Sequence, residues 1–252
     1  MSEFSRRKFM VAGIGAAAGL SGLGVAARLA EKYGLIPPDH GGVYGIGESL
    51  TYASHRLLGR HSLAREFSRS QISQRPVAND VAPLPEEFKR LESGQFTDWR
   101  VTIDGLVDRP TAFSIDQLKS YPSSTQITEV VCEEGWSYIA EWNGVQLSRI
   151  LDLVGTQPHA KYVVYYSFQP DWWESMDMAD AMHPQTFLTY GMNGDTLPVG
   201  NGGPVRMRLP RQLGYKSVKY ITHLTLTDDI RKFGKGLGSA SPEAGYAWYA
   251  GI

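Results

Sequence analysis

Short apolar segments of the kind that form β-strands recur between residues 99 and 227, and they constrain the fold of this 252-residue chain more than any other feature. Residues 99–106 alternate between apolar and polar side chains, as a half-buried strand does. Residues 162–166 are all valine or tyrosine, a composition typical of strands. Because the expected strands outnumber the expected helices and do not alternate regularly with them, we predict an α+β domain with mixed sheets.

Local signals place the remaining elements. Ser114 and Gln117 have the spacing of a capping box, which predicts that a helix begins there. A second helix is expected over residues 147–154, because Gly155 can end it. Residues 169–175 are expected to form a loop that contains two tryptophans. Further strands are predicted to end at Cys132 and to cover residues 186–192, 205–209 and 221–227, and a further helix is predicted over residues 85–91.

The first thirty residues have the features of an export signal. Residues 5–10 (SRRKFM) resemble the twin-arginine motif, and residues 11–27 form an uncharged segment rich in glycine and alanine. This segment is only weakly hydrophobic, whereas a membrane helix needs about 20 predominantly apolar residues. We therefore expect a signal rather than a permanent anchor. The protein is predicted to be periplasmic, and to be tethered to the membrane only if the signal is not cleaved.

A glycine-rich pattern at residues 13–19 is similar to a dinucleotide-binding loop. It follows two arginines rather than a strand, so we reject that interpretation. The twin-arginine route carries proteins that are already folded, often around a cofactor. The export signal therefore favours a cofactor-containing protein.

Residues 31–80 are predicted to be an irregular lead-in with a short apolar face at Leu50, Leu57 and Leu58. Residues 55–75 carry five arginines against one acid, Glu66. Such a run is usually a solvated face. The alternative is a basic wall beside an anionic cofactor or an acidic redox partner, and the sequence leaves both open.

The charge balance and the histidine spacing exclude two classes of site. The chain has 25 basic and 26 acidic residues, for a net charge of −1, whereas nucleic-acid-binding domains are usually strongly basic. Its six histidines include no pair at i, i+2 or i, i+4, and one cysteine cannot build a cysteine-rich zinc site. We therefore expect no nucleic-acid partner and no structural zinc.

Cys132 is the single cysteine of the chain. It follows the largely apolar residues 127–131 and precedes a charged turn that contains Gly135. A thiolate at such a position can bind a soft transition metal, which it prefers to magnesium or calcium. The alternative is that Cys132 packs as a small buried hydrophobe. A lone cysteine cannot form an internal disulfide in an exported protein, and metal ligation would explain its free thiol.

The sequence around Cys132 belongs to an ordered set of motifs. Together the motifs resemble, in order and spacing, the molybdenum-binding core of the sulfite oxidase fold family. The resemblance covers about residues 79–230. Its motifs are Cys-x-x-x-Trp-Ser at 132–137 followed by Trp-x-Gly-Val-x-Leu at 142–147, LTYGMNG at 188–194, NGGPVR at 201–206 and GYKSVK at 214–219.

This resemblance implies a sulfite oxidase-type molybdopterin-binding fold with mixed sheets for residues 81–252. Only 22 residues follow Ile230, and an immunoglobulin-like sandwich domain needs about 100 residues. The dimerisation domain of true sulfite oxidases is therefore expected to be absent, and we expect a monomer.

The cofactor implied by the resemblance is molybdenum held by the dithiolene of a molybdopterin, with Cys132 as the protein thiolate. The pterin ends in a phosphate, which amide, hydroxyl, backbone N–H and guanidinium groups can bind. Without the other motifs, residues 202–204 would be expected to form a plain turn, and Arg206 and Arg208 to lie on the exposed face of a strand. Carried over position by position, the resemblance assigns to cofactor binding Asn79, Cys132, Ser167, Asn201, Arg206, Ser217, Val218 and Lys219.

Two departures from the sulfite oxidases bear on the reaction. Those enzymes carry arginines soon after the cysteine, and this chain has Glu133 and Glu134 there instead. They also carry a tyrosine near the metal, and this chain has Trp172 at that position. A pocket rimmed by carboxylates and tryptophan should disfavour sulfite. The sequence after Cys132 is more similar to that of the periplasmic methionine sulfoxide reductase catalytic subunits. We take Cys132, Glu134 and Trp172 as candidate catalytic residues. Glu134 could instead be a solvated loop carboxylate, and Trp172 a packed aromatic residue.

We accordingly predict a molybdopterin-dependent oxidoreductase that reduces a sulfoxide or another small oxo-acceptor by oxygen-atom transfer. A sulfite dehydrogenase-like enzyme acting on an oxo-donor substrate, and a non-enzymatic periplasmic binding domain, remain as alternatives. The chain has no Cys-x-x-Cys-His haem attachment site and no cysteines for an iron–sulfur cluster. Electron transfer should therefore require a separate haem redox partner, either a membrane haem protein or a soluble cytochrome.

Overall fold

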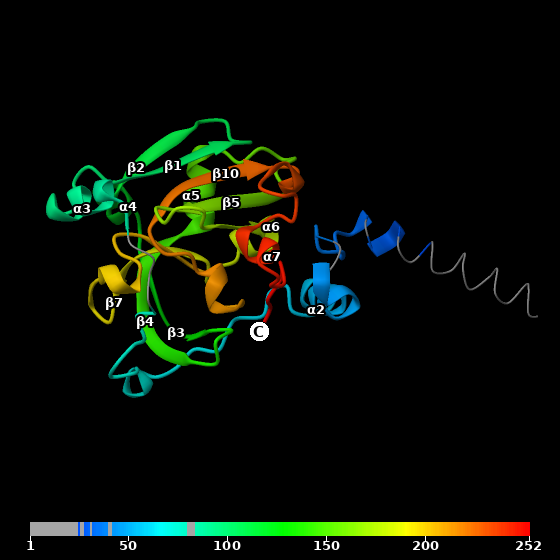
Figure 1. Ribbon diagram of the computed structural model, residues 1–252, viewed down its shortest axis with the longest axis horizontal. Helices are drawn as coiled ribbons and strands as arrows, with labels where there is room; N and C mark the ends of the chain where they lie inside the picture. The colour runs from blue at the N-terminus through cyan, green and yellow to red at the C-terminus, as the bar shows by residue number, and fades with distance from the viewer. Residues whose placement is uncertain (1–24, 26–27, 31, 40–41, 80–83) are drawn as a thin grey trace, which may run out of the picture.

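In the part of the chain that the structure describes, ten strands in two sheets form the centre (Figure 1). The computed structural model describes residue 25 and residues 28–30, 32–39, 42–79 and 84–252. The first sheet contains β1 (Arg100–Gly105), β2 (Thr111–Ser114), β5 (Tyr162–Ser167), β6 (Trp173–Asp177) and β10 (Ile221–Thr227). Its order is β2-β1-β10-β5-β6, with β1 and β10 parallel and the other pairs antiparallel. This mixed sheet confirms the prediction.

The second sheet is antiparallel throughout and carries the segment around Cys132. It contains β3 (Ser124–Val131), β4 (Ser137–Gln146), β7 (Phe187–Met192), β8 (Asp195–Thr196) and β9 (Arg206–Arg208). The order is β3-β4-β7-β8, and β9 also pairs with β7. Parts of three of the motifs, residues 142–146, residues 188–192 and Arg206, therefore lie on β4, β7 and β9 of one sheet.

The start of α4 and the end of α5 lie where the local signals predict them. Ser114 Oγ accepts a hydrogen bond from Gln117 N at 3.1 Å and Gln117 Oε1 accepts one from Ser114 N at 2.8 Å, which confirms the capping box. Gly155, at φ 73°, ends α5 as predicted. The α-helices are α2 (Gly45–Leu57), α3 (Glu86–Ser93), α4 (Ile115–Ser120), α5 (Leu147–Val154), α6 (Met178–Ala181) and α7 (Ala240–Glu243), and the 3-10 helices are η1 (Gly42–Tyr44), η2 (Arg69–Gln71), η3 (Val199–Asn201), η4 (Gly214–Lys216) and η5 (Ile230–Lys232).

The main core joins both sheets to α5. This helix buries Leu147, Ile150, Leu151 and Val154, in line with the apolar spacing of an amphipathic helix. The same cluster includes Val101 and Ile103 of β1, Val163 and Tyr165 of β5, Leu188 of β7 and Met207 of β9. Since residues of both sheets share one packed core, the loops at the sheet ends are held at fixed positions relative to each other.

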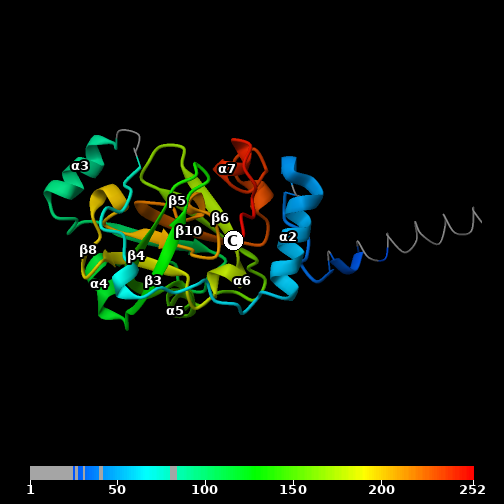
Figure 2. The ribbon, with the colours of Figure 1, turned by 90° about the horizontal axis from the view of Figure 1, so that it is seen from below.

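Helix α2 departs from the prediction that the lead-in is irregular. It is a regular helix of 13 residues, and it lies beside the C-terminal segment in both views (Figures 1 and 2). The predicted apolar face is wrong, because Leu50, Leu57 and Leu58 are 65%, 65% and 87% exposed. The helix instead buries Glu48 and Tyr52, a polar and aromatic contact that a search for apolar periodicity does not detect.

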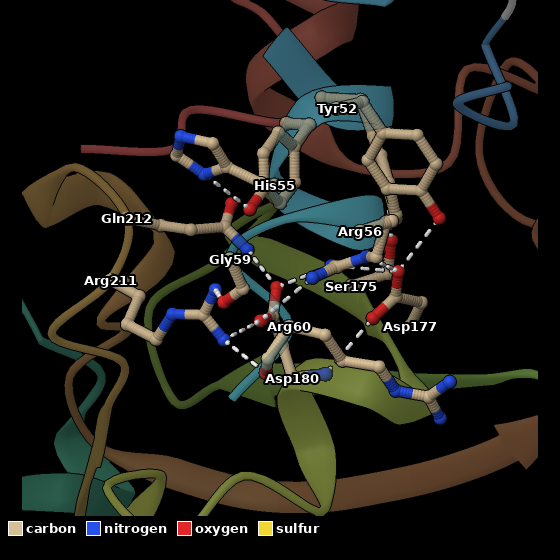
Figure 3. Close-up of polar contacts among 12 residues, drawn as sticks. Tyr52, His55, Arg56, Gly59, Arg60, Ser175, Asp177, Asp180, Arg211 and Gln212 are labelled. Carbon is tan, nitrogen blue, oxygen red and sulfur yellow. Dashed lines mark hydrogen bonds and ion pairs between the residues drawn. The ribbon is translucent and has the colours of Figure 1, made fainter. Parts of the chain in front are cut away.

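Arg56 of α2 is the centre of a buried ionic cluster (Figure 3). Its guanidinium lies 2.7 Å from an oxygen of Asp177 and 2.8 Å from an oxygen of Asp180. Tyr52 also donates a hydrogen bond to Asp177, and Gln212 donates one to Asp180. For Arg56, neither of the two alternatives predicted for the arginine-rich run holds: it is not on a solvated face, and it does not line the cavity at Cys132. The ionic cluster instead attaches α2 to the end of β6 and to α6.

The predicted loop over residues 169–175 is shorter than expected. Strand β6 begins at Trp173, which pairs with Tyr166 of β5, so only Trp172 of the two tryptophans lies in the loop. The pairing with β5 is a long-range contact, and it overrides a local sequence that does not alternate between apolar and polar residues.

In the described part of the chain, no helix is long and apolar enough to cross a membrane. The twin-arginine motif at residues 5–10 and the glycine pattern at residues 13–19 lie outside the described residues. The export signal therefore stays a prediction.

Candidate active site

Cys132 lies in the tight turn between β3 and β4. Its N–H donates to the carbonyl of Trp136 at 2.9 Å, and the N–H of Gly135 donates to the carbonyl of Cys132 at 3.1 Å. Gly135 has a φ of 91°, which favours glycine at this position. The 3-10 helix η4 passes close by, and a Cβ on Gly214 would lie 3.2 Å from the carbonyl oxygen of Val131. The two glycines thus allow the backbone to hold the thiol at a fixed position.

Two carboxylates face the thiol. The Sγ of Cys132 lies 3.4 Å from an oxygen of Glu133 and 3.9 Å from an oxygen of Glu134. The indole N–H of Trp136 donates to the same Glu134 oxygen at 2.8 Å and orients it. Burial, with a contribution from both carboxylates, raises the pKa of Cys132 to about 11. Without a bound metal the thiol is protonated at neutral pH, and a metal must displace this proton in order to bind.

A cavity of about 330 Å³ opens above the thiol. It is formed by the β3–β4 turn, β9, the segment after η4 and the loop between β5 and β6. The structure thus brings together residues that are far apart in the sequence. The predicted site residues that line it are Asn79, Cys132, Glu134, Trp172, Arg206, Ser217, Val218 and Lys219.

Ser167 and Asn201, which were also predicted to bind the cofactor, do not line this cavity. Ser167 Oγ donates to the carbonyl of Lys219 at 2.9 Å. The carbonyl of Asn201 accepts from Arg206 at 3.0 Å, and its side chain donates to the carbonyl of Val77 at 3.3 Å. Both residues lie behind cavity-lining residues and hold them in place.

Three buried cations lie in or beside the cavity. Arg206, Arg208 and Lys219 are 5%, 0% and 9% exposed, so the alternative of an exposed strand face is wrong for both arginines. Within the described residues, all three donate to neutral oxygens and none forms an ion pair with a carboxylate. The guanidinium of each arginine also lies over the ring of Trp142, at 5.5 and 5.3 Å from the ring centroid.

This cluster is suited to an anionic ligand. Buried charges are costly unless they are paired, and the Nε of Arg208 has no hydrogen-bond partner among the described residues. Burial, and after it the charge of Arg206, lowers the pKa of Arg208 and that of Lys219, the latter to about 7. A phosphate would supply the missing negative charge. With the thiol in the same cavity, the donor set fits a phosphate-bearing cofactor that carries a soft metal.

The pKa of Lys219 yields a test of this cluster. Unfolded lysine titrates near 10.4, so between about pH 7 and pH 10 the unfolded chain binds more protons than the folded cofactor-free protein. The free energy of unfolding of the cofactor-free protein should therefore rise with pH in this window, by roughly 1–3 kcal/mol between pH 7 and pH 9.5. Urea unfolding of Lys219→Met should show a much smaller rise, while the exposed control Lys89→Met should behave as the wild type. An unchanged pH slope in Lys219→Met would contradict the assignment.

The fold also brings residues to the cavity that the sequence analysis did not select. Gln169, Tyr215 and Tyr246 line it, and the hydroxyl of Tyr138 lies 3.5 Å from the guanidinium of Arg206. Gln169 and Tyr215 flank predicted residues along the chain. Tyr246 comes from the C-terminal segment, where the sequence contains no signal for a site.

The comparison with known proteins identifies the family. The sequence profile of the oxidoreductase molybdopterin binding domain matches residues 89–232, more than half of the chain. The chain belongs to this family. It is therefore a molybdopterin-dependent oxidoreductase, which confirms the predicted enzyme class and cofactor.

Two relatives of the family are similar in sequence. A protein of Azospira oryzae, provisionally named protein-methionine-sulfoxide reductase subunit YedZ1, is 36% identical over 195 residues, which are 77% of this chain and 70% of the relative. The protein-methionine-sulfoxide reductase catalytic subunit MsrP of Ralstonia nicotianae is 34% identical over 145 residues, which are 52% of this chain and 44% of the relative.

One solved structure confirms the predicted fold. The sulfane dehydrogenase SoxCD of Paracoccus pantotrophus matches with a TM-score of 0.52 at 21% identity, over 68% of this chain and 46% of that chain. At this identity the likeness concerns the fold alone. The chain thus spans less than half the length of MsrP and of the SoxCD chain.

Proposed function

We propose that this protein is an exported oxidoreductase that reduces a sulfoxide, or another small neutral S- or N-oxide, at molybdenum. The observation that carries the proposal is the pair of carboxylates, Glu133 and Glu134, within 3.4 and 3.9 Å of the Cys132 thiol. They stand where sulfite binding would require cationic donors, and two negative groups repel a small dianion. The two relatives carry the names of a provisionally assigned subunit and of the catalytic subunit of protein-methionine-sulfoxide reductases, and these names point to the same substrate class.

The residues of the cavity have distinct roles in this proposal. Cys132 is the protein ligand of the metal, and Arg206, Ser217 and Lys219 bind the phosphate of the pterin with the adjoining Val218. Ser167 and Asn201 position Lys219 and Arg206 through their hydrogen bonds. Glu134, oriented by Trp136, and Trp172 shape the space in which the substrate binds. Asn79 is exposed and lines the cavity, and it too binds the cofactor.

Molybdenum in such a cofactor supplies two-electron oxygen-atom transfer. Reduction of an S-oxide consumes two electrons and two protons and releases the sulfide and water. Within the described residues no group of ligands for a further metal centre is present. We propose that the electrons come from a separate haem redox partner, the partner expected from the sequence.

The proposal extends to location and organisation. Residues 1–30 act as the twin-arginine signal, residues 31–80 lead into the enzyme and residues 81–252 form the molybdopterin-binding domain of a periplasmic monomer. Helix α2 belongs to the lead-in and packs on that domain through Arg56.

Steady-state assays with both substrate classes test the function. We expect the molybdenum-loaded protein to reduce dimethyl sulfoxide with a reduced dye as donor, with a kcat/KM above that for sulfite oxidation with a cytochrome acceptor. Each charge-assisted hydrogen bond that this site cannot make to sulfite costs roughly 1.5–3 kcal/mol of binding free energy. This corresponds to a loss of about one to two powers of ten in the affinity for sulfite. Efficient sulfite turnover without sulfoxide reduction would refute the proposal.

Export gives an independent prediction. Arg6 and Arg7 form the pair in the twin-arginine motif, so replacement of both by lysine should retain the charge and still block export. Fractionation of expressing cells should find the variant in the cytoplasm and the wild type in the periplasm. A variant that reaches the periplasm as efficiently as the wild type would show that another signal directs export.

A further inference from the structure

A second cavity, of about 510 Å³, adjoins the cavity at Cys132. The two share Glu133, Tyr215 and Tyr246 among their lining residues. The remaining walls come from the start of α2 and from the C-terminal segment, which lie side by side in both views (Figures 1 and 2). We call this second cavity the tyrosine groove. A molecule whose reacting group enters the Cys132 cavity can extend its other end into this groove.

The lining of the tyrosine groove is aromatic and acidic. Its charged lining residues are Glu48 and Glu133, and no lysine or arginine is among the described residues that line it. Four tyrosines complete the walls. Tyr44 and Tyr246 are 54% and 40% exposed and form the rim, while Tyr215 and Tyr249 are buried. The rings of Tyr215 and Tyr246 are 5.5 Å apart between centroids.

Glu48 is the feature that points to a ligand. Its side chain is 5% exposed, and one carboxylate oxygen accepts a hydrogen bond from the N–H of Tyr249 at 2.7 Å. The other oxygen is buried and has no hydrogen-bond partner among the described residues. An unpaired buried carboxylate oxygen is costly. A cationic ligand in the groove would compensate this charge.

The charges around Glu48 agree with that reading. The pKa of Glu48 is raised to about 7, mainly by burial; the N–H of Tyr249 and the charge of Lys216 act to lower it, and the charge of Asp39 acts to raise it. Lys216 does not neutralise Glu48, because its ammonium lies 2.8 Å from Glu174 and both side chains are fully buried. A bound cation would therefore favour the ionised form of Glu48.

The aromatic walls suit a cation equally well. Tyrosine faces attract alkylammonium groups through their ring quadrupole, most strongly where the cation is desolvated, and cages of aromatic rings with a carboxylate are a known solution for such ligands. The guanidinium of Arg56 already lies 4.9 Å from the ring centroid of Tyr249, so the rings left for a ligand are those of Tyr44, Tyr215 and Tyr246.

We propose that the tyrosine groove binds an alkylammonium group, so that the substrate reduced at the Cys132 cavity carries a cationic group beside its S- or N-oxide. The link to catalysis rests on the proposed function, whereas the binding of the cation rests on the groove alone. Glu48 is the charged partner of this group, and Tyr44, Tyr215 and Tyr246 surround it.

Titration calorimetry of the molybdenum-loaded protein with choline tests the proposal, and 3,3-dimethylbutan-1-ol, which has the same shape without the charge, is the matched neutral probe. We expect choline to bind at least about tenfold more tightly than the alcohol. Glu48→Gln retains an oxygen acceptor for the N–H of Tyr249 and should weaken choline binding by about tenfold, as should Tyr246→Leu. The exposed control Glu92→Gln should bind choline as the wild type does.

The outcomes separate the groove from the proposed function. Equal binding of choline and the alcohol, no binding of choline, or unchanged affinity in Glu48→Gln would overturn the groove proposal. Dimethyl sulfoxide turnover, measured on the same preparations, reports on the proposed function. Choline binding without turnover of dimethyl sulfoxide or of any other S- or N-oxide would support the groove proposal and refute the proposed function. Turnover without choline binding would support the proposed function and refute the groove proposal.

Discussion

Replacement of Cys132 by serine should lower turnover by more than about a hundred-fold and deplete the purified protein of molybdenum. Loss of residues that merely support a metal ligand typically costs about 10–100-fold, and Cys132 is the single thiol of the chain. A hydroxyl is a much poorer ligand than a thiolate for a soft metal site. Molybdenum analysis of the variant, expressed in a cofactor-competent host, measures the loss.

The same variant should stay folded, which makes the result interpretable. Cys132 is 8% exposed, and its thiol lies 3.4 Å from an oxygen of Glu133 and 3.9 Å from an oxygen of Glu134. The smaller serine side chain therefore fits the site without a clash. Thermal unfolding of cofactor-free wild type and variant should therefore give similar midpoints. Unchanged molybdenum content in a folded variant would instead favour a binding domain in which Cys132 serves only for packing.

Replacement of Arg56 by methionine should destabilise the protein by about 3–5 kcal/mol. The arginine is 7% exposed and lies between Asp177 and Asp180, and its removal leaves two buried carboxylates close together. Burial already raises the pKa of Asp177, with a further rise from Asp180 that Arg56 opposes. Arg211, at 3.7 Å from Asp180, compensates only part of the lost charge.

Urea unfolding measures this effect, with Arg90→Met as the control. Arg90 pairs with Glu87 across one turn of α3, and both side chains are more than half exposed, so its loss should cost less than about 1 kcal/mol. Because the Arg56 cluster attaches α2 to α6, the variant should also lose choline binding in the tyrosine groove. Equal stability of the two variants would show that the cluster does not anchor α2.

The parts of the fold that the sequence predicts are those that depend on local signals. The capping box at Ser114 and the glycine at position 155 act within one turn of the chain, and both helix ends lie where expected. Helix α2 was missed because it is held by an ionic cluster and by Tyr52 against the C-terminal aromatic residues, and such long-range polar contacts leave no periodic pattern. Strand β6 was missed because its pairing with β5 is equally non-local.

In the candidate site, too, the sequence predicts the residues that belong to local motifs but not the features that depend on packing. The ordered motifs identify most residues of the Cys132 cavity, since each motif supplies its groups from one short segment. Ser167 and Asn201 carry the family pattern but lie one layer behind the cavity, a distinction that depends on side-chain direction. The burial of Arg206 and Arg208 follows from the packing of the three-residue strand β9 beside Trp142, which an alternating strand pattern does not reveal.

The assignment of Cys132 as the metal ligand is tested most directly by X-ray absorption at the molybdenum edge. Wild-type protein should show one more sulfur ligand at molybdenum than the residual molybdenum retained by the depleted Cys132→Ser variant, because the thiolate adds to the sulfurs of the dithiolene. An equal number of sulfur ligands in the two proteins would contradict the account and separate the cavity at Cys132 from the metal.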